Sequence, residues 1–208
     1  MTARRLTVAA TAIAAAMVLT ACGGSESRPK DGKISGAEEG PGKPSASPSA
    51  GVDRPEVKLP KSFQMNFENW TNGDPKLQAI LDDGKEELRA DHAAIIEKDL
   101  NSEAVKFYNA PKARKTSHEY VKGYVDDDVT LVGKARVFNP QVRISSEGFG
   151  ILFYCVDESR GYTKDRKTGK RTGTPSNVNP HVQYRTTLAK HRNGVWVTTH
   201  SETERGGC

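Results

Sequence analysis

The sequence predicts an α+β domain, with N-terminal helices packed on one face of an antiparallel sheet. Apolar residues recur at near-helical spacing from about residue 75 to residue 125, and after Asp126-Asp127-Asp128 they alternate with polar residues instead. Helices followed by a run of strands are typical of this class. The folded part is assigned to residues 58–208, which is the size of one domain with a single core.

A strand and a long helix open the domain. Alternating apolar residues at 63–67 predict a half-buried strand. Asp74 is a favourable N-cap and Pro75 suits the first helical position, so we expect a helix from there to about residue 100. Gly84 weakens this helix locally and predicts the close approach of another element.

Two shorter helices are expected to follow. The first covers residues 102–109, and the second covers residues 117–125. Helical spacing places Tyr120, Val121 and Tyr124 on one face of the second helix, which predicts that this face packs against the sheet.

The remaining segments are predicted to form strands, with the strongly apolar segment at the centre of the sheet. The predicted strands are residues 129–144, 149–156, 181–192 and 195–203. Asn193-Gly194 between alternating segments is a strong signal for a hairpin with a two-residue turn. Such a turn would pair His191 with Trp196 and Thr187 with His200.

Residues 1–21 have the features of a bacterial lipoprotein signal peptide. Arg4 and Arg5 supply positive charge, and the apolar run at 6–19 is far shorter than the ~20 residues that cross a bilayer. Leu19-Thr20-Ala21-Cys22 matches a lipobox, which predicts acylation of Cys22 and anchoring at the extracytoplasmic face of the cell membrane. An ordinary secretory signal with a coincidental cysteine is the alternative, and Sec or twin-arginine export stays open.

Residues 22–57 are predicted to be the lipidated cysteine and a disordered linker. The segment is built mainly from Gly, Ser, Pro, Lys, Glu and Ala, and it contains no aromatic residue. It buries too little apolar surface to offset the entropy of ordering it. We expect it to act as a spacer between the membrane and the domain.

The remaining two cysteines, Cys155 and Cys208, are expected to form one intramolecular disulfide. An exported protein folds in an oxidising compartment, where paired cysteines persist as disulfides. The bridge would fasten the C-terminus to the central strand. Two free thiols are the alternative.

No sequence motif indicates a catalytic or metal site. The five histidines lack the spacing of a zinc site, and neither Cys-x-x-Cys, Gly-x-Ser-x-Gly nor a phosphate loop occurs. No metal and no cofactor are therefore expected. The net charge of +5 is only mildly basic and argues neither for nor against nucleic acid, which we do not expect as a partner.

One stretch of the sequence is strongly basic. It contains Arg160, Lys164, Arg166, Lys167, Lys170 and Arg171. On an envelope protein these residues predict contact with phospholipid headgroups, an anionic wall polymer or an acidic partner. The alternative is a protruding hairpin that its charges keep soluble.

Several short segments occur in a particular order along the domain: residues 67–74, 107–108, 154–159, 168–170, 194–197 and 204–208. Their order and spacing resemble a family of secreted actinobacterial lipoproteins of unassigned function with an NTF2-like (cystatin-like) domain. The resemblance covers nearly all of the domain, and it implies a cone with a curved, concave sheet. Such cones occur in isomerases, cyclases and dehydratases, and also in proteins that only bind or dimerise.

The resemblance also implies a pocket inside the cone. Its predicted lining is Trp70, Tyr120 and Tyr124, with Tyr154 or Asp157 at the end of the central strand. An Asp and a Tyr in an apolar cone are the groups with which isomerase-type members move a proton and stabilise an enolate. Such catalysis would require an acid or base with a strongly shifted pKa inside the pocket.

Together these observations predict a membrane-anchored extracytoplasmic lipoprotein whose domain is a non-catalytic binding or interaction module. Its expected partners are the membrane, through Cys22, and an envelope protein or anionic wall polymer. Two alternatives stay open: an NTF2-like enzyme of the isomerase or cyclase type, and a structural accessory subunit of an envelope complex. An exposed apolar patch well above a few hundred Å² would favour the accessory subunit.

Overall fold

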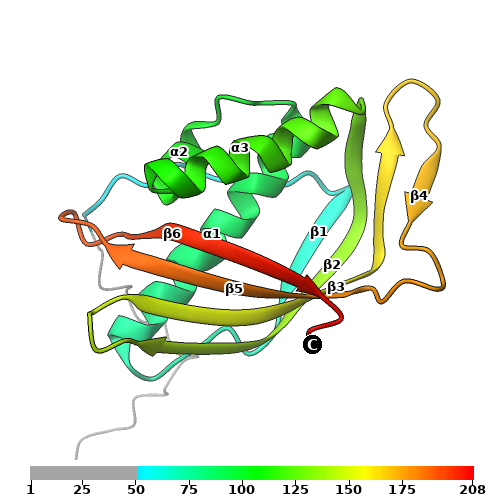
Figure 1. The fold of residues 1–208 in the computed structure, drawn as a ribbon. Helices are drawn as coiled ribbons and strands as arrows, with labels where there is room; N and C mark the ends of the chain where they lie inside the picture. The colour runs from blue at the N-terminus through cyan, green and yellow to red at the C-terminus, as the bar shows by residue number, and fades with distance from the viewer. Residues whose placement is uncertain (1–50) are drawn as a thin grey trace, which may run out of the picture. The chain divides into compact units, whose positions relative to one another are not determined.

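Three helices lie on the concave face of a six-stranded sheet in the computed structural model, which describes residues 51–208 (Figure 1). The helices are α1 (Pro75–Glu97), α2 (Glu103–Tyr108) and α3 (Pro111–Asp126). The strands are β1 (Phe63–Phe67), β2 (Val129–Ile144), β3 (Gly150–Asp165), β4 (Arg171–Gly173), β5 (His181–Lys190) and β6 (Trp196–Arg205). The α+β class and the curved sheet are confirmed. Cys22, the signal peptide and most of the predicted linker lie outside the described residues.

The sheet has the strand order β1-β2-β3-β5-β6, and β4 pairs with β3 outside this path. All of these pairs are antiparallel except β1 and β2, which run parallel, with Phe63 opposite Gly133 and Phe67 opposite Val137. The prediction of a purely antiparallel sheet is therefore wrong at this edge. The three helices between β1 and β2 carry the chain back to the end where β1 begins, and a parallel pair needs such a crossover.

Irregularities in β2 account for the curvature of the sheet. The pairing of β2 with β3 shifts between Lys134 and Arg136 and again between Phe138 and Gln141. Gly133, just before the first shift, has a φ of 96°, and a Cβ there would lie 2.3 Å from the backbone oxygen of a β3 residue. Such bulges bend a strand and increase its twist.

Helix α1 forms as its local signals predict. The Asp74 side chain accepts a hydrogen bond of 2.8 Å from the backbone N–H of Lys76, and Pro75 is the first helical residue. Gly84 brings the helix against the sheet, because a Cβ at this position would lie 2.6 Å from Cδ2 of Leu152. This confirms the predicted close approach. None of the described helices is both long enough and apolar enough to cross a membrane.

Helix α3 begins at Pro111, earlier than the predicted start at residue 117. A proline at the first helical position supports this start. Ala113, Ser117 and Val121 are buried at intervals of four residues, so the inner face of the helix begins before the tyrosines that marked it in the sequence.

The last hairpin has a longer turn than predicted. Lys190, rather than His191, pairs with Trp196, because the turn contains more than two residues and ends with a left-handed glycine. A register shift after Thr187 restores the predicted pairing of Thr187 with His200.

Both ends of the described chain are fastened to the domain. Arg54 donates to Oδ1 of Asp83 at 2.8 Å, and Val57 is buried, so residues 54–57 pack on α1 rather than belonging to the linker. At the other end, Cys155 and Cys208 lie in a disulfide with their Cα atoms 6.1 Å apart, as the sequence predicts. Closing a loop of this length stabilises a fold by about 4 kcal/mol in the chain-entropy model.

Candidate functional site

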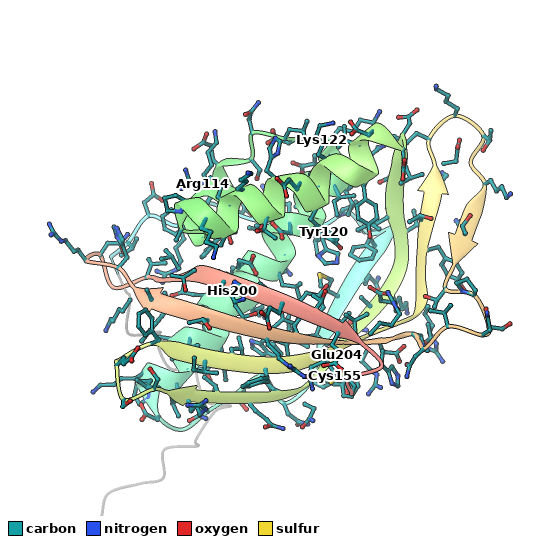
Figure 2. All side chains as sticks on the ribbon, viewed as in Figure 1. Arg114, Tyr120, Lys122, Cys155, His200 and Glu204 are labelled. Atoms are coloured by element: carbon teal, nitrogen blue, oxygen red, sulfur yellow. A yellow bond between two sulfur atoms is a disulfide. The ribbon has the colours of Figure 1, made fainter. Side chains whose placement is uncertain are left out.

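A cavity lies between helices α1 and α3 and the concave side of the sheet. It has two adjoining compartments of about 280 and 260 Å³, and both are lined by Tyr120, Tyr124, Glu158 and Arg205. Figure 2 shows Tyr120 on the side of α3 that faces the sheet. The apolar compartment is further lined by residues that include Phe63, Leu131, Ala135, Val156 and Tyr162. The acidic compartment is further lined by residues that include Glu87, Asp91, Asn109, Ser117 and Tyr184.

Two carboxyl groups from α1 define the acidic compartment. Glu87 and Asp91 lie one helical turn apart, and Oδ2 of Asp91 accepts a hydrogen bond of 3.1 Å from the Ser117 hydroxyl. Burial raises the pKa of Asp91 to about 7, although the bond from Ser117 opposes the change. Burial and the neighbouring Asp91 charge raise the pKa of Glu87 well above its usual value, against a hydrogen bond with Asn109. Both groups therefore hold a proton more tightly than exposed carboxylates do.

Two oxygen atoms in this compartment have no hydrogen-bond partner. They are Oδ1 of Asp91 and Oδ1 of Asn109, and both are shielded from solvent. Asn109 is only 2% exposed, and its side-chain N–H donates to the backbone oxygen of Val105 at 3.2 Å. Buried polar atoms are nearly always paired, so each of these oxygens calls for an explanation. A hydrogen-bond donor from a water molecule or from a bound ligand would supply the missing partners.

Tyrosines form the aromatic wall of the cavity. The rings of Tyr120 and Tyr124 meet edge to face with their centroids 5.3 Å apart, and Tyr184 stacks on Tyr154 at 4.9 Å. Tyr120 is 36% exposed, so part of its ring surface is available to a ligand. Burial raises the pKa of Tyr184 strongly, and its hydroxyl therefore stays neutral.

The other acidic and basic side chains of the cavity are either paired with an opposite charge or neutral. Glu158 and Arg205 form an ion pair of 2.8 Å. His92 is buried beside the Phe63 ring, at 5.6 Å between centroids, and burial lowers its pKa, so the imidazole is neutral at physiological pH. The net charge of the cavity is therefore set by Glu87 and Asp91.

Three of the five residues predicted to line a pocket lie elsewhere. Trp70 is a core residue, and its Nε1–H donates to the backbone oxygen of Leu81 at 2.7 Å. Tyr154 is 2% exposed and lies behind Tyr184 rather than at the cavity wall. Only Tyr120 and Tyr124 line the cavity as predicted.

Asp157 lies on the convex face of the sheet. Successive side chains of a strand point to opposite faces, and Asp157 shares the face of Cys155 rather than that of Val156. Its Oδ2 lies 3.5 Å from the Arg136 guanidinium, and its Oδ1 accepts a hydrogen bond of 2.9 Å from the Ser159 N–H. The pairing of Asp157 with a cavity tyrosine is thus excluded by strand geometry.

One of the six residues of the predicted basic surface, Arg166, is bound to backbone carbonyl groups of the domain. The Arg166 guanidinium donates to the backbone oxygens of Ile95 at 2.9 Å and Ile96 at 3.0 Å, near the C-terminal end of α1, and to that of Val129 at 3.2 Å. Arg166 therefore satisfies carbonyl groups at a helix end. Arg160, Lys167, Lys170 and Arg171 are exposed, and Lys164 is half-buried.

Sequence reasoning missed Glu87, Asp91, Tyr184 and Arg205. A signal existed for the first two, because they fall on the same face of the helix as the buried Gly84. The positions of Tyr184 and Arg205 depend on the pairing of β5 with β6, including its register shift, which no local pattern reveals.

Within residues 51–208, no group of three or more His, Cys, Asp or Glu side chains is arranged to hold a metal ion.

The domain is thus an α+β fold with a cavity lined by aromatic and acidic side chains, and comparisons with known proteins add only distant likenesses. No family model and no curated protein matches the chain. Among solved structures, it is similar to the intermembrane space region of the chloroplast protein ARC6, with a TM-score of 0.46 and 8% identity over 65% of this chain and 100% of that chain. It is also similar to a protein from Catenulispora acidiphila (TM-score 0.44, 12% identity, 61% of this chain and 91% of that chain). ActVI-ORFA from Streptomyces coelicolor is a third (TM-score 0.44, 6% identity, 62% and 96%). Likenesses this distant carry no argument about function.

Proposed function

We propose that this chain is a lipid-anchored extracytoplasmic lipoprotein whose domain binds a small molecule in the cavity without converting it. The observation that carries the proposal is the pair of unpartnered, buried oxygens of Asp91 and Asn109 in a cavity with an aromatic wall. An unsatisfied buried acceptor destabilises a fold, and a ligand with matching donors removes that cost. Concave, largely apolar sites with a few convergent polar groups are typical of small-molecule binding.

The proposed location is supported by the N-terminal sequence and by the disulfide. Leu19-Thr20-Ala21-Cys22 follows a short apolar run, which is the pattern of a lipoprotein signal. The bridge between Cys155 and Cys208 fits an oxidising compartment outside the cytoplasm.

A proton-transfer enzyme of the isomerase or cyclase type is the second candidate. The observation that favours it is the pKa of Asp91, about 7, in a cavity that is also lined by tyrosines. Both candidates require a ligand in the cavity, so binding is the common and better supported step.

The accessory-subunit alternative has less support. Four large apolar or aromatic side chains are exposed among the described residues: Tyr120, Ile144, Phe149 and Tyr162. Tyr120 and Tyr162 line the cavity, which leaves only Ile144 and Phe149 beside the β2–β3 turn. Two such side chains do not make a patch of the size that marks a stable interface.

Mass spectrometry of the full-length protein, purified from its own cell envelope in mild detergent, tests the proposal. Under denaturing conditions we expect a chain that begins at Cys22 and carries acyl chains. Under native conditions we expect the additional mass of a small molecule. An unmodified Cys22 would contradict the anchor, and identical native and denatured masses would contradict the ligand.

The same sample separates binding from catalysis. The recovered small molecule is incubated with ligand-free protein and followed by chromatography and mass spectrometry. An unchanged molecule supports a binding protein, whereas steady conversion would establish the enzyme candidate instead.

A further inference from the structure

We infer that the ligand of this cavity is a small organic cation, a primary or secondary ammonium group attached to an apolar or aromatic body. The inference rests on the proposed function, because it names the class of ligand for the same cavity. Three independent features carry it: the charge of the acidic compartment, the hydrogen-bonding capacity of its unpaired atoms, and the composition of the adjoining walls.

The acidic compartment contains two carboxyl groups, and no cationic side chain in its described lining is available to balance their charge once they ionise. Glu87 is 6% exposed, and neither Glu87 nor Asp91 takes part in any ion pair among the described residues. The one guanidinium in the lining, that of Arg205, is paired with Glu158 at 2.8 Å. Buried carboxyl groups in proteins are normally paired, so a cation from outside is the partner that this compartment lacks.

The unpaired atoms select a hydrogen-bond donor. Oδ1 of Asn109 can only accept a hydrogen bond, and so can Oδ1 of Asp91 when the carboxyl group is ionised. They come from different elements, α1 and the residue that follows α2, and both residues line the acidic compartment, so satisfying both oxygens requires more than one N–H donor. An ammonium group has such donors, whereas a carboxylate, an ether or a quaternary ammonium has none.

The walls suit an apolar or aromatic body next to this charge. Tyr120, Tyr124 and Tyr184 line the acidic compartment, and tyrosine rings attract cations through their faces. The shared tyrosines lead into the apolar compartment, whose lining includes Phe63 and Leu131. A molecule with its ammonium group at Asp91 can therefore extend its body along the aromatic wall.

Calorimetric titration of the full-length, ligand-free protein at about pH 8 tests the inference with three probes of similar size. They are 2-phenylethylammonium, the neutral 2-phenylethanol and the anionic 3-phenylpropanoate. We expect the ammonium to bind about tenfold or more tightly than the alcohol, and the carboxylate to bind most weakly. Equal binding of the alcohol and the ammonium, or no binding of the ammonium, would overturn the inference.

Variants locate the site. Asp91→Asn keeps the size of the side chain and removes its charge, so we expect the preference for the ammonium over the alcohol to fall about tenfold. Glu87→Gln provides a second test, should Asp91→Asn not fold. Glu97→Gln is the matched control, because Glu97 is exposed on the same helix and outside the cavity, and it should leave the preference unchanged. A full preference retained by both cavity variants would overturn the inference.

The outcomes separate this inference from the proposed function. If the alcohol binds as tightly as the ammonium, the cavity is still a binding site, but not one for cations. Recovery from the envelope of a bound small molecule that lacks a basic nitrogen would lead to the same conclusion. If no probe binds and the native mass shows no ligand, both the inference and the proposed function fail.

Discussion

Asp83 and Asp91 both lie on α1, and their hydrogen-bond partners differ in a way that separates a structural role from a functional one. Asp83 has partners at both oxygens: Arg54 donates to Oδ1, and the backbone N–H of Trp196 donates to Oδ2, each at 2.8 Å. Asp91 has one partner and one unsatisfied oxygen. Asp83 thus joins segments of the fold, whereas Oδ1 of Asp91 has no hydrogen-bond partner within the protein. Residues that break local rules without compensation are expected at functional sites.

Replacing Asp91 with Asn should stabilise the protein at alkaline pH. The pKa of Asp91 is about 7 in the folded protein, against an ordinary value of 3.8, so between these values the folded state holds the proton more tightly than the unfolded state. The free energy of unfolding must therefore fall as the pH rises from about 4 to about 7. Asp91→Asn removes this loss, so we expect a gain of about 1–3 kcal/mol at about pH 8 and little difference at about pH 4. Urea denaturation at both pH values measures it.

Glu97→Gln again provides the control for this prediction. It removes one exposed carboxylate from the same helix, so its stability should follow that of the wild type at both pH values. Parallel pH dependence in Asp91→Asn and the wild type would contradict the burial of Asp91.

At the scale of single residues, the sequence predicts which types of residue line the cavity better than it predicts where each side chain points. Tyr120 and Tyr124 were found because helical spacing fixes their face. Trp70 is predicted to line the pocket, but it packs in the core, where its indole N–H donates a hydrogen bond to the Leu81 carbonyl. Asp157 is predicted to line the pocket because it lies at the end of the central strand, although strand alternation directs its side chain to the opposite face.

Elements were predictable where their signals are local. The N-cap and proline of α1 lie next to each other in the sequence, and the strand at 63–67 has its own alternation. The first turns of α3 were not predicted, because only Ala113 is buried within residues 111–116. The sequence there shows no apolar residues at helical spacing. The parallel pairing of β1 with β2 joins segments that three helices separate, and only the folded arrangement reveals it.

Gly133 is the element-scale position most sensitive to a single methyl group. Its φ of 96° is strained for any other residue, and an added Cβ would meet the Arg160 backbone oxygen at 2.3 Å. The clash is with backbone, which can move only at a large cost in energy. Gly133→Ala should therefore destabilise the protein by about 2–4 kcal/mol, which urea denaturation measures.

Gly123→Ala is the matched control with the opposite sign. Gly123 lies in α3, and nothing lies within 4 Å of an added Cβ. The change should stabilise the protein by about 0.5–1 kcal/mol, because alanine favours the helix. If Gly133→Ala also proved neutral or stabilising, the bulge would not have the geometry described here.

At the scale of the whole molecule, the fold keeps the cavity open by fastening its frame on both sides. The Arg54–Asp83 pair ties the first described residues to α1, and the disulfide of Cys208 ties the last residue to β3. Helix α3 covers the cavity through Ala113, Ser117 and Tyr120, which leaves a space rather than a packed core beneath it. A rigid frame around an unfilled space is what holds a binding site in one geometry.

The basic surface concerns the whole molecule, because it would decide how the domain is oriented on an anionic surface. Figure 1 shows β4 and the end of β3 as a hairpin at one side of the sheet. Lys167, Lys170 and Arg171 are exposed there, whereas Arg166 is engaged with α1. Basic residues near an anionic membrane contribute about 1 kcal/mol each at low salt.

Reversing these three charges should weaken binding to anionic vesicles. In sedimentation with phosphatidylglycerol vesicles, Lys167→Glu/Lys170→Glu/Arg171→Glu should bind at least about tenfold more weakly than the wild type. Reversal of Lys112, Lys115 and Lys122, exposed on α3, changes the net charge equally and serves as the control. A larger loss in the hairpin variant than in the control supports an oriented contact. Equal losses would mean that only net charge matters, and unchanged binding in both would remove the electrostatic contact altogether.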